Sequence, residues 1–284
     1  MKKIIERLLV FFIGIPAVAS LVLFLPYYSH LTMNIFVIIF SAAGAYEFSK
    51  MLENRQLKIS RMEAVILGSL MPLAATLVTS FNCPEWLFSF LFVTGSGWVI
   101  LSCVFSGADK MDSVTGRIAA GFSVIIYPGF FMCWVVRMTI WNNPAAILVF
   151  LFIVFGSDSA AWLLGNIFGA NNRGIIAASP NKSIAGFIGG FIGAIIVSCG
   201  ASLIVPDVFV THTDLHAAVS AIILGICTGI AATLGDLAES AIKRSCNVKD
   251  SGNMMLGRGG ILDSIDSIAV AAPVYFLLFN IFFY

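Results

Sequence analysis

Two apolar runs near the end of the chain decide the fold. They are residues 217–239, AAVSAIILGICTGIAATLGDLAE, and residues 267–283, SIAVAAPVYFLLFNIFF. Each is close to the ~20 residues that an α-helix needs to cross a ~30 Å hydrocarbon core. Between them lies a polar stretch, residues 240–266, with the sequence SAIKRSCNVKDSGNMMLGRGGILDSID. The pattern predicts two membrane-spanning helices joined by a charged segment.

The composition excludes a soluble globular protein. Of the 284 residues, 59% are hydrophobic and only 11% are charged, whereas a soluble domain has about 25% charged residues. The net charge of +1 gives no indication of a nucleic-acid partner. The six cysteines form no CxxC pair and lie mostly in apolar runs, so we expect neither a disulfide framework nor a zinc site.

Apolar runs of similar length recur along the whole chain. We therefore expect an all-α polytopic membrane protein with about nine transmembrane helices. The N-terminal run continues to about Tyr27, too long for a typical signal peptide, so we interpret it as an uncleaved first span. Residues 1–140 would form about five N-terminal helices, and residues 141–284 about four catalytic helices with the 240–266 segment, in a single integral membrane unit. The expected spans are about 8–26, 31–48, 64–81, 86–105, 118–140, 145–165, 184–205, 217–239 and 267–283.

Basic residues predict the orientation, because cytoplasmic loops of membrane proteins carry an excess of Lys and Arg. With the N-terminus in the cytoplasm, every Lys and Arg except Arg137 falls on the cytoplasmic side. This arrangement puts the C-terminus outside and all three histidines on the outer side. Any chemistry in the 240–266 segment would then depend on carboxylates, Lys, Arg and a metal ion.

The 240–266 segment mixes acids, bases and glycines. Carboxylates hold hard cations through oxygen, Lys and Arg neutralise phosphate oxygens, and glycine lets backbone N–H groups approach a phosphate. The mixture suits a metal-bound polyphosphate better than a plain charged loop, which is usually basic. The residues concerned are Lys243, Arg244, Lys249, Asp250, Gly257, Arg258, Gly259, Gly260, Asp263 and Asp266, with Asp236 and Glu239 just upstream.

Helical spacing groups the acids further. On one helix, Asp236, Glu239, Ser240 and Lys243 would share a face. Asp263 and Asp266 repeat the i, i+3 spacing at the start of the last span, and carboxylates on converging helix ends predict a cradle for one or two divalent cations. The alternative is that Asp236 and Glu239 merely pair with Lys243 and Arg244.

Three further features lie upstream. Asp158 falls within a span, where an acid is costly and usually faces the bundle interior. Glu47 lies near Lys50 and the membrane interface, which favours a structural role. The sequence Ser179-Pro180-Asn181-Lys182-Ser183 predicts a turn that brings Lys182 beside the next helix start. In the span at 184–205, glycines at i, i+4 spacing predict close helix packing; they are Gly186, Gly189, Gly190 and Gly193.

Together these motifs resemble the phosphatidate cytidylyltransferase (CDP-diacylglycerol synthase) family. The residues that match its C-terminal signature in register are Ser240, Ile242, Lys243, Arg244, Lys249, Asp250, Gly252, Gly259, Gly260, Ile261, Asp263, Ile265 and Asp266. Three upstream stretches also resemble family motifs: residues 235–240, residues 158–165, and residues 179–183 followed by Gly186. The resemblance covers essentially the whole chain and is strongest from residue 156 onward.

The chain departs from the family pattern at five positions. The signature's Pro, His and second Arg are replaced by Leu256, Arg258 and Ser264. In the Ser-Pro loop, the family's first Lys is Asn181 and its Glu is Ala185. Arg258 could still donate to a phosphate, whereas Ser264 removes a cation beside Asp263. These changes leave open a slower enzyme, a different substrate or an inactive paralogue.

The resemblance implies transfer of CMP from CTP to phosphatidate in the cytoplasmic leaflet, with release of pyrophosphate and with Mg²⁺ as cofactor. It also implies an integral protein of a bacterial inner (cytoplasmic) membrane, a cytoplasmic active site, a homodimer and no nucleic-acid partner. The implied catalytic residues are Asp236, Lys243, Lys249, Asp250 and Asp263, and the implied metal ligands are Asp236, Asp250, Asp263 and Asp266. Substrate would be bound by Asp158, Ser179, Lys182, Glu239, Ser240, Arg244, Arg258, Gly259 and Gly260.

Two other functions remain open at this point. A related CTP-dependent enzyme would use another lipid acceptor. An ion-coupled transporter would use Asp158, Asp236 and Glu239 as an ion path, and would need polar residues through the full depth of the bundle.

Overall fold

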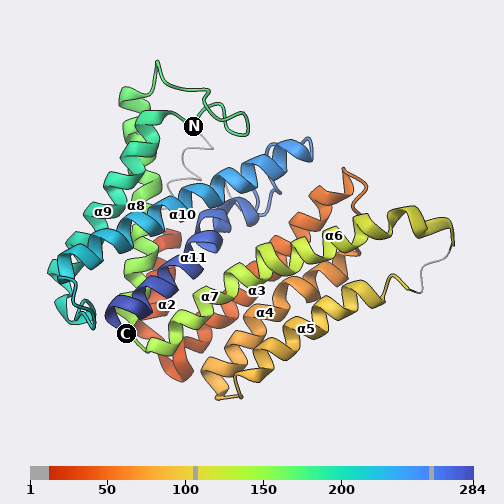
Figure 1. Ribbon diagram of the computed structural model, residues 1–284, viewed down its shortest axis with the longest axis horizontal. Helices are drawn as coiled ribbons and strands as arrows, with labels where there is room; N and C mark the ends of the chain where they lie inside the picture. Colours follow the sequence, from red (N-terminus) through yellow and green to blue (C-terminus); the bar gives the residue numbers. More distant parts are fainter. Residues whose placement is uncertain (1–12, 105–107, 256–258) are drawn as a thin grey trace. The chain divides into compact units, whose positions relative to one another are not determined.

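The structure is a computed structural model that describes residues 13–104, 108–255 and 259–284. In these residues the secondary structure is helical, with only two isolated β-bridges, Arg173–Ser183 and Met255–Gly259, and no strand. Figure 1 labels the α-helices, which are α2 (Ile15–Phe24), α3 (Tyr27–Glu53), α4 (Arg61–Phe81), α5 (Trp86–Leu101), α6 (Val114–Val124), α7 (Phe131–Arg137), α8 (Pro144–Phe168), α9 (Ile184–Ile204), α10 (Ala217–Ser245) and α11 (Leu262–Phe283).

Seven helical segments in the described residues are long and apolar enough to cross a membrane. They are α3, α4, the continuous stretch Met111–Trp141 that contains α6 and α7, and α8 to α11. The helix α5 lies at the predicted fourth span but has only 16 residues, and part of the predicted first span lies outside the described residues. The protein is therefore an integral membrane protein, and the expected total of nine spans stays a prediction.

Packing divides the chain into two compact units. One comprises Met1–Ile140 with Lys243–Ile265, and the other comprises Trp141–Ile242 with Asp266–Tyr284. The helices α10 and α11 contribute to both units. Residues 240–266 are called the signature segment below, and most of them, Lys243–Ile265, belong to the unit of the N-terminal helices.

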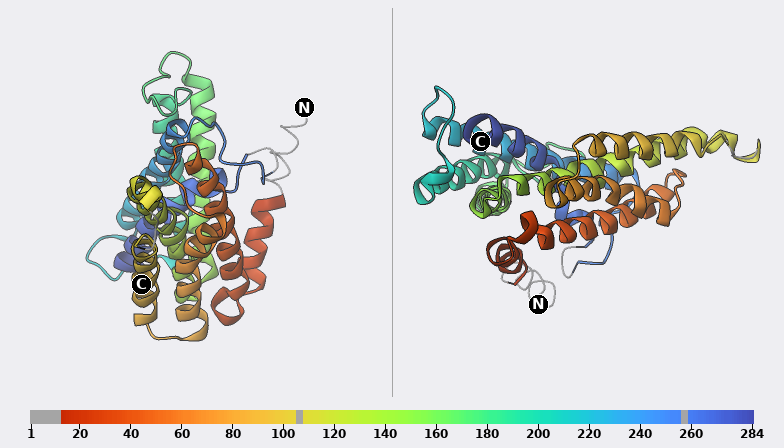
Figure 2. Two further views of the ribbon diagram at one scale, coloured as in Figure 1. Left: turned by 90° about the vertical axis from the view of Figure 1, so that its right-hand side faces the viewer. Right: turned by 90° about the horizontal axis from the view of Figure 1, so that it is seen from below.

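In the first unit, small residues let neighbouring helices approach closely. A Cβ atom added to Gly121 of α6 would lie 2.6 Å from Val99 of α5, and Gly68 of α4 lies against Ala45 of α3. Figures 1 and 2 show α3, α4, α5 and α6 running alongside one another. Pro128 interrupts the long Met111–Trp141 segment with a π-helical turn, Ile125–Phe130, as expected where proline removes a backbone donor.

In the second unit, α8 and α9 pack through the glycine-rich stripe that the sequence predicted (Figure 1). A Cβ atom added to Gly189 would lie 2.8 Å from the Ala160 carbonyl oxygen, and one added to Gly193 would lie 2.9 Å from that of Gly156. The prediction that these glycines serve helix packing is confirmed. Ser183 caps α9, since its hydroxyl oxygen accepts a 3.0 Å hydrogen bond from the Gly186 N–H.

The helices that frame the signature segment are longer than the sequence indicated. The helix α10 continues to Ser245, and α11 begins at Leu262 rather than near residue 267. Asn247 ends α10 in the left-handed conformation with φ 58°, a common way to terminate a helix. Lys243 therefore lies in the last turn of α10, and Asp263 lies in the first turn of α11.

Candidate active site

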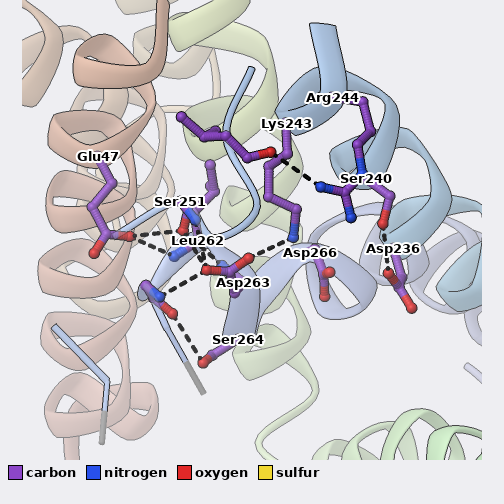
Figure 3. Close-up of polar contacts among 12 residues, drawn as sticks. Glu47, Asp236, Ser240, Lys243, Arg244, Ser251, Leu262, Asp263, Ser264 and Asp266 are labelled. Atoms are coloured by element: carbon purple, nitrogen blue, oxygen red, sulfur yellow. Dashed lines mark hydrogen bonds and ion pairs between the residues drawn. The ribbon is translucent and has the colours of Figure 1, made fainter. Parts of the chain in front are cut away.

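In the first unit, Lys243 and Asp263 form an ion pair. The distance from Lys243 Nζ to Asp263 Oδ1 is 2.5 Å, and the two side chains are only 11% and 8% exposed. Figure 3 shows the pair beside the connection between α10 and α11. A charged pair that is largely shielded from water needs further hydrogen bonds to satisfy its remaining polar atoms.

The second oxygen of Asp263 receives those hydrogen bonds. The N–H of Ser251 donates to Oδ2 at 2.8 Å, the Ser251 hydroxyl donates at 2.8 Å, and the N–H of Gly260 donates at 2.7 Å. Asp263 thereby ties Ser251 and Gly260 to the first turn of α11. As the side chains lie, both of its oxygens are occupied by protein donors.

Glycine is needed at position 259 for two reasons. Its φ of +101° is a conformation that L side chains rarely adopt, and an added Cβ atom would lie 2.8 Å from Asp263 Oδ2 and 3.2 Å from Asp250 Cβ. Lys249 and Asp250 are exposed nearby in the signature segment. Arg244 is also exposed, and it donates a 3.4 Å hydrogen bond to the Val248 carbonyl. The prediction for Arg258 lies outside the described residues.

Glu47 of α3 joins this group, which the sequence analysis missed. Its Oε2 accepts a hydrogen bond from the Leu262 N–H at 3.0 Å and lies 3.3 Å from the Ser251 hydroxyl oxygen, whose single proton it shares with Asp263 (Figure 3). Glu47 is 2% exposed, whereas Lys50, the basic residue near it in sequence, is exposed. Glu47 is therefore buried against Ser251 and Leu262, a contact that its position near Lys50 in the sequence did not indicate.

In the second unit, Lys182 and Asp236 form an ion pair with 2.6 Å between Nζ and Oδ2. The predicted turn is present: the N–H of Lys182 donates to the Ser179 carbonyl at 3.1 Å, and the chain then enters α9. Ser240 lies one turn beyond Asp236 on α10, and its hydroxyl is 3.4 Å from Asp236 Oδ1. Asp236 therefore has Lys182 as a partner, and the pairing of Asp236 and Glu239 with Lys243 and Arg244 stays an alternative.

Three other acids of the second unit lie near Asp266. The Asp266 side chain is 8% exposed and interacts electrostatically with Asp236, Glu239 and Asp158. Close helix approach makes this possible, because an added Cβ atom at Gly235 of α10 would run into the Asp266 carbonyl of α11. Glu239 is fully buried. Asp266 and Glu239 are buried members of this acidic group, and like charges at low exposure favour a bound cation or a proton.

The four expected metal ligands lie two in each unit. Within the described ranges, no group of three or more His, Cys, Asp or Glu side chains is placed to hold a metal ion as it stands. Asp236 and Asp266 belong to the acidic group of the second unit, Asp263 is bound to Lys243, and Asp250 is exposed. Their role as metal ligands stays a prediction.

Comparison with known proteins identifies the family. The profile of the cytidylyltransferase family matches residues 5–282. The chain belongs to the cytidylyltransferase family. The phosphatidate cytidylyltransferase of Thermotoga maritima is 34% identical over 223 residues, which cover 78% of this chain and 78% of that protein. The Bacillus subtilis phosphatidate cytidylyltransferase is 33% identical over 162 residues, covering 54% and 55% of the two chains. That of Staphylococcus haemolyticus is 38% identical over 133 residues, covering 46% and 48%.

In this cytidylyltransferase, contacts join two sets of the predicted residues, one set within each unit. Lys243, Asp263 and Gly260 are joined by hydrogen bonds in the first unit, whereas Lys182, Asp236 and Ser240 are joined in the second. Sequence reasoning missed Ser251 together with Glu47. A sequence does not indicate that a serine hydroxyl will lie between two acids. The position of Glu47 inside an expected span was an available signal, because an acid there usually faces the protein interior.

Proposed function

We propose that this protein is a phosphatidate cytidylyltransferase, which transfers CMP from CTP to phosphatidate and releases pyrophosphate. The observation that carries the proposal is membership of the cytidylyltransferase family over residues 5–282. Relatives named phosphatidate cytidylyltransferase, including the one from Thermotoga maritima, support the lipid acceptor.

The chemistry suits the residues present. A phosphate oxygen of phosphatidate attacks the α-phosphorus of CTP, a P–O bond forms, and the bond to pyrophosphate breaks. The lipid phosphate is already anionic, so the reaction needs positioning and charge neutralisation more than a general base. The reaction therefore needs no histidine, and the candidate site offers acids, lysines and arginines instead.

Lysines and arginines supply the positive charge. Lys182 and Lys243 would neutralise phosphate oxygens, and they are held beside the acids by ion pairs of 2.6 and 2.5 Å. The exposed Lys249 and Arg244 are accessible for the triphosphate or the lipid head group. Gly259 and Gly260 would allow backbone groups near the substrate.

Mg²⁺ remains part of this proposal. Asp266 fits a divalent cation best, because it belongs to the crowded acidic group and offers oxygen ligands that Mg²⁺ prefers. Asp236 of the same group would be a second ligand, and a cation there would displace Lys182 from it. Bound there, Mg²⁺ would neutralise nucleotide phosphates. Asp263 fits less well as a ligand, since Lys243, Ser251 and Gly260 already engage its oxygens.

The membrane setting follows from the same argument. We place the N-terminus and the signature segment on the cytoplasmic side of a bacterial inner membrane, where CTP is available, and the C-terminus outside. Bacterial relatives support the location. A homodimer stays a proposal that rests on the family resemblance alone, because the glycine stripe of α9 is already packed against α8.

The other candidates are distinguished by substrate. Family membership does not favour the ion-coupled transporter. A different lipid acceptor and an inactive paralogue remain as alternatives because Ser264 and Ala185 depart from the family pattern. The Ser264 hydroxyl donates to the Gly260 carbonyl, at 3.3 Å.

The test is CDP-diacylglycerol formation by the purified full-length protein in detergent, with CTP, phosphatidate and Mg²⁺. We expect product and pyrophosphate in equal amounts, and no product when EDTA is present. Parallel reactions contain a polyprenyl phosphate or diacylglycerol in place of phosphatidate. Product with one of these alone would show a different acceptor, and CTP binding without turnover on any lipid would show an inactive paralogue.

A further inference from the structure

A buried acid of α3 anchors the signature segment from more than 200 positions away in the chain. Glu47 Oε2 accepts a hydrogen bond from the Leu262 N–H and lies 3.3 Å from the Ser251 hydroxyl, two groups of the connection between α10 and α11 (Figure 3). Leu262 is the first residue of α11. Its N–H is one of the groups that a helix start leaves without an intrahelical partner, and a carboxylate there is favoured by the helix dipole.

Two glycines of the signature segment, Gly252 and Gly260, lie in close contact with the same carboxylate. A Cβ atom added to Gly252 would collide with the Glu47 side chain, and one added to Gly260 would collide with both Glu47 and the Ser251 hydroxyl. Neither glycine has a positive φ. Glycine is therefore needed at both positions because a larger residue would collide with the Glu47 side chain.

Ser251 links Glu47 to the ion pair. Its hydroxyl oxygen lies 3.3 Å from Glu47 Oε2 and 2.8 Å from Asp263 Oδ2. The Ser251 N–H also donates to Asp263, which in turn binds Lys243. The contacts run without interruption from Glu47 through Ser251 and Asp263 to Lys243. All four residues lie in the first unit.

We propose that Glu47 is a positioning residue for nucleotidyl transfer. By holding Ser251 and the start of α11, it fixes the carboxylate of Asp263, and Asp263 orients the Lys243 ammonium toward the phosphates. Glu47 itself does not touch the substrate. This inference rests on the proposed function for its kinetic test and on the contacts alone for its structural test.

The kinetic test is a double-mutant cycle on Glu47→Ala and Ser251→Ala, measured as kcat/KM for CTP with phosphatidate. We expect Glu47→Ala to lower kcat/KM by about 30-fold or more. The kcat/KM of the double variant should lie within about threefold of that of the less active single variant. Fold losses that multiply would show independent roles and overturn the proposal, as would full activity of Glu47→Ala.

A conservative variant separates anchoring from general stability. Glu47→Gln keeps an oxygen that can accept the Leu262 N–H, so it should recover at least about fivefold in kcat/KM over Glu47→Ala. Equal losses in the two variants would overturn hydrogen-bond anchoring. The matched control is Glu53→Ala on the same helix, whose carboxylate is 39% exposed and pairs with Arg61 at 3.4 Å; its activity should be unchanged.

Hydrogen exchange tests the anchor without any substrate. Peptides covering residues 249–255 and 259–263 should exchange about tenfold faster in Glu47→Ala than in wild type, while peptides from α8 and α9 stay unchanged. Unchanged exchange at 249–255 and 259–263 would overturn the proposal even if the protein proved to be inactive. Faster exchange in a protein that makes no CDP-diacylglycerol would support the anchor and reject the proposed function.

Discussion

Lys243 Nζ lies 2.5 Å from Asp263 Oδ1, at the point where the end of α10 meets the start of α11. The two residues are 20 positions apart, and both side chains are largely shielded from solvent. Such a pair is costly to break, because removing one partner leaves the other charge buried without compensation, typically at about 3–5 kcal/mol.

We first predict that Lys243→Met lowers kcat/KM for CTP by at least about 100-fold, because the variant loses a phosphate-neutralising charge and releases Asp263. Lys243→Arg should retain part of the activity, since the charge stays but the compact ammonium does not. The control is Lys58→Met at an exposed position of the same unit. Steady-state kinetics check the prediction, and a Lys243→Met enzyme within threefold of wild type would contradict it.

The second prediction concerns metal dependence. Asp236→Asn and Asp266→Asn should each raise the Mg²⁺ concentration for half-maximal activity by about tenfold or more, because each removes a charged oxygen ligand. Asp207→Asn, at an exposed position of the same unit, should leave it unchanged. Activity titrations with Mg²⁺ after EDTA treatment measure the effect. An unaltered Mg²⁺ requirement in both site variants would rule out the assignment of Asp236 and Asp266.

Asp266→Asn should also stabilise the metal-free protein. The Asp266 side chain is 8% exposed and interacts with three other carboxylates. The neutral amide of Asp266→Asn relieves that repulsion. We expect Tm in EDTA to rise by about 2–4 °C. A lower Tm would indicate that Asp266 makes a stabilising contact that outweighs the repulsion.

A fourth prediction uses the glycines that border Glu47. Gly260→Ala should cost about 1–3 kcal/mol and remove most of the activity, because its methyl group would collide with Glu47 and Ser251. Gly97→Ala is the matched control in the same unit, since nothing lies within 4 Å of a Cβ atom added there. Thermal unfolding in detergent and the CTP assay measure both variants. Equal behaviour of the two would show that the signature segment yields to the added methyl group.

The fifth prediction tests the packing of α8 on α9. Gly193→Ala should lower Tm by about 2–8 °C, because a Cβ atom there would lie 2.5 Å from the Ala160 Cβ. Gly200→Ala on the same helix should leave Tm unchanged or slightly raised, since its added Cβ atom meets nothing within 4 Å. If the two variants had the same Tm, the glycine stripe would not be needed for close packing.

Much of the site was visible in the sequence as residue types. The signature from Ser240 to Asp266 identified the acids, bases and glycines, and the i, i+4 glycines of α9 predicted its packing face correctly. The pairing of those residues was less accessible. Helical spacing placed Asp236 and Lys243 on one face, but it did not indicate that Asp236 would bind Lys182 or that Lys243 would bind Asp263, because both partners come from other parts of the chain.

The sequence by itself determined that this protein is a membrane-embedded helical member of its family, because apolar runs must bury their backbone as helices in lipid and the signature spacing is long and specific. Only the tertiary structure decided which acid meets which base, and that Glu47 holds the signature segment. The physical reason is that hydrogen bonds and ion pairs act over about 3 Å, so they depend on how distant segments pack. Local periodicity carries no information about a contact between residues 47 and 262.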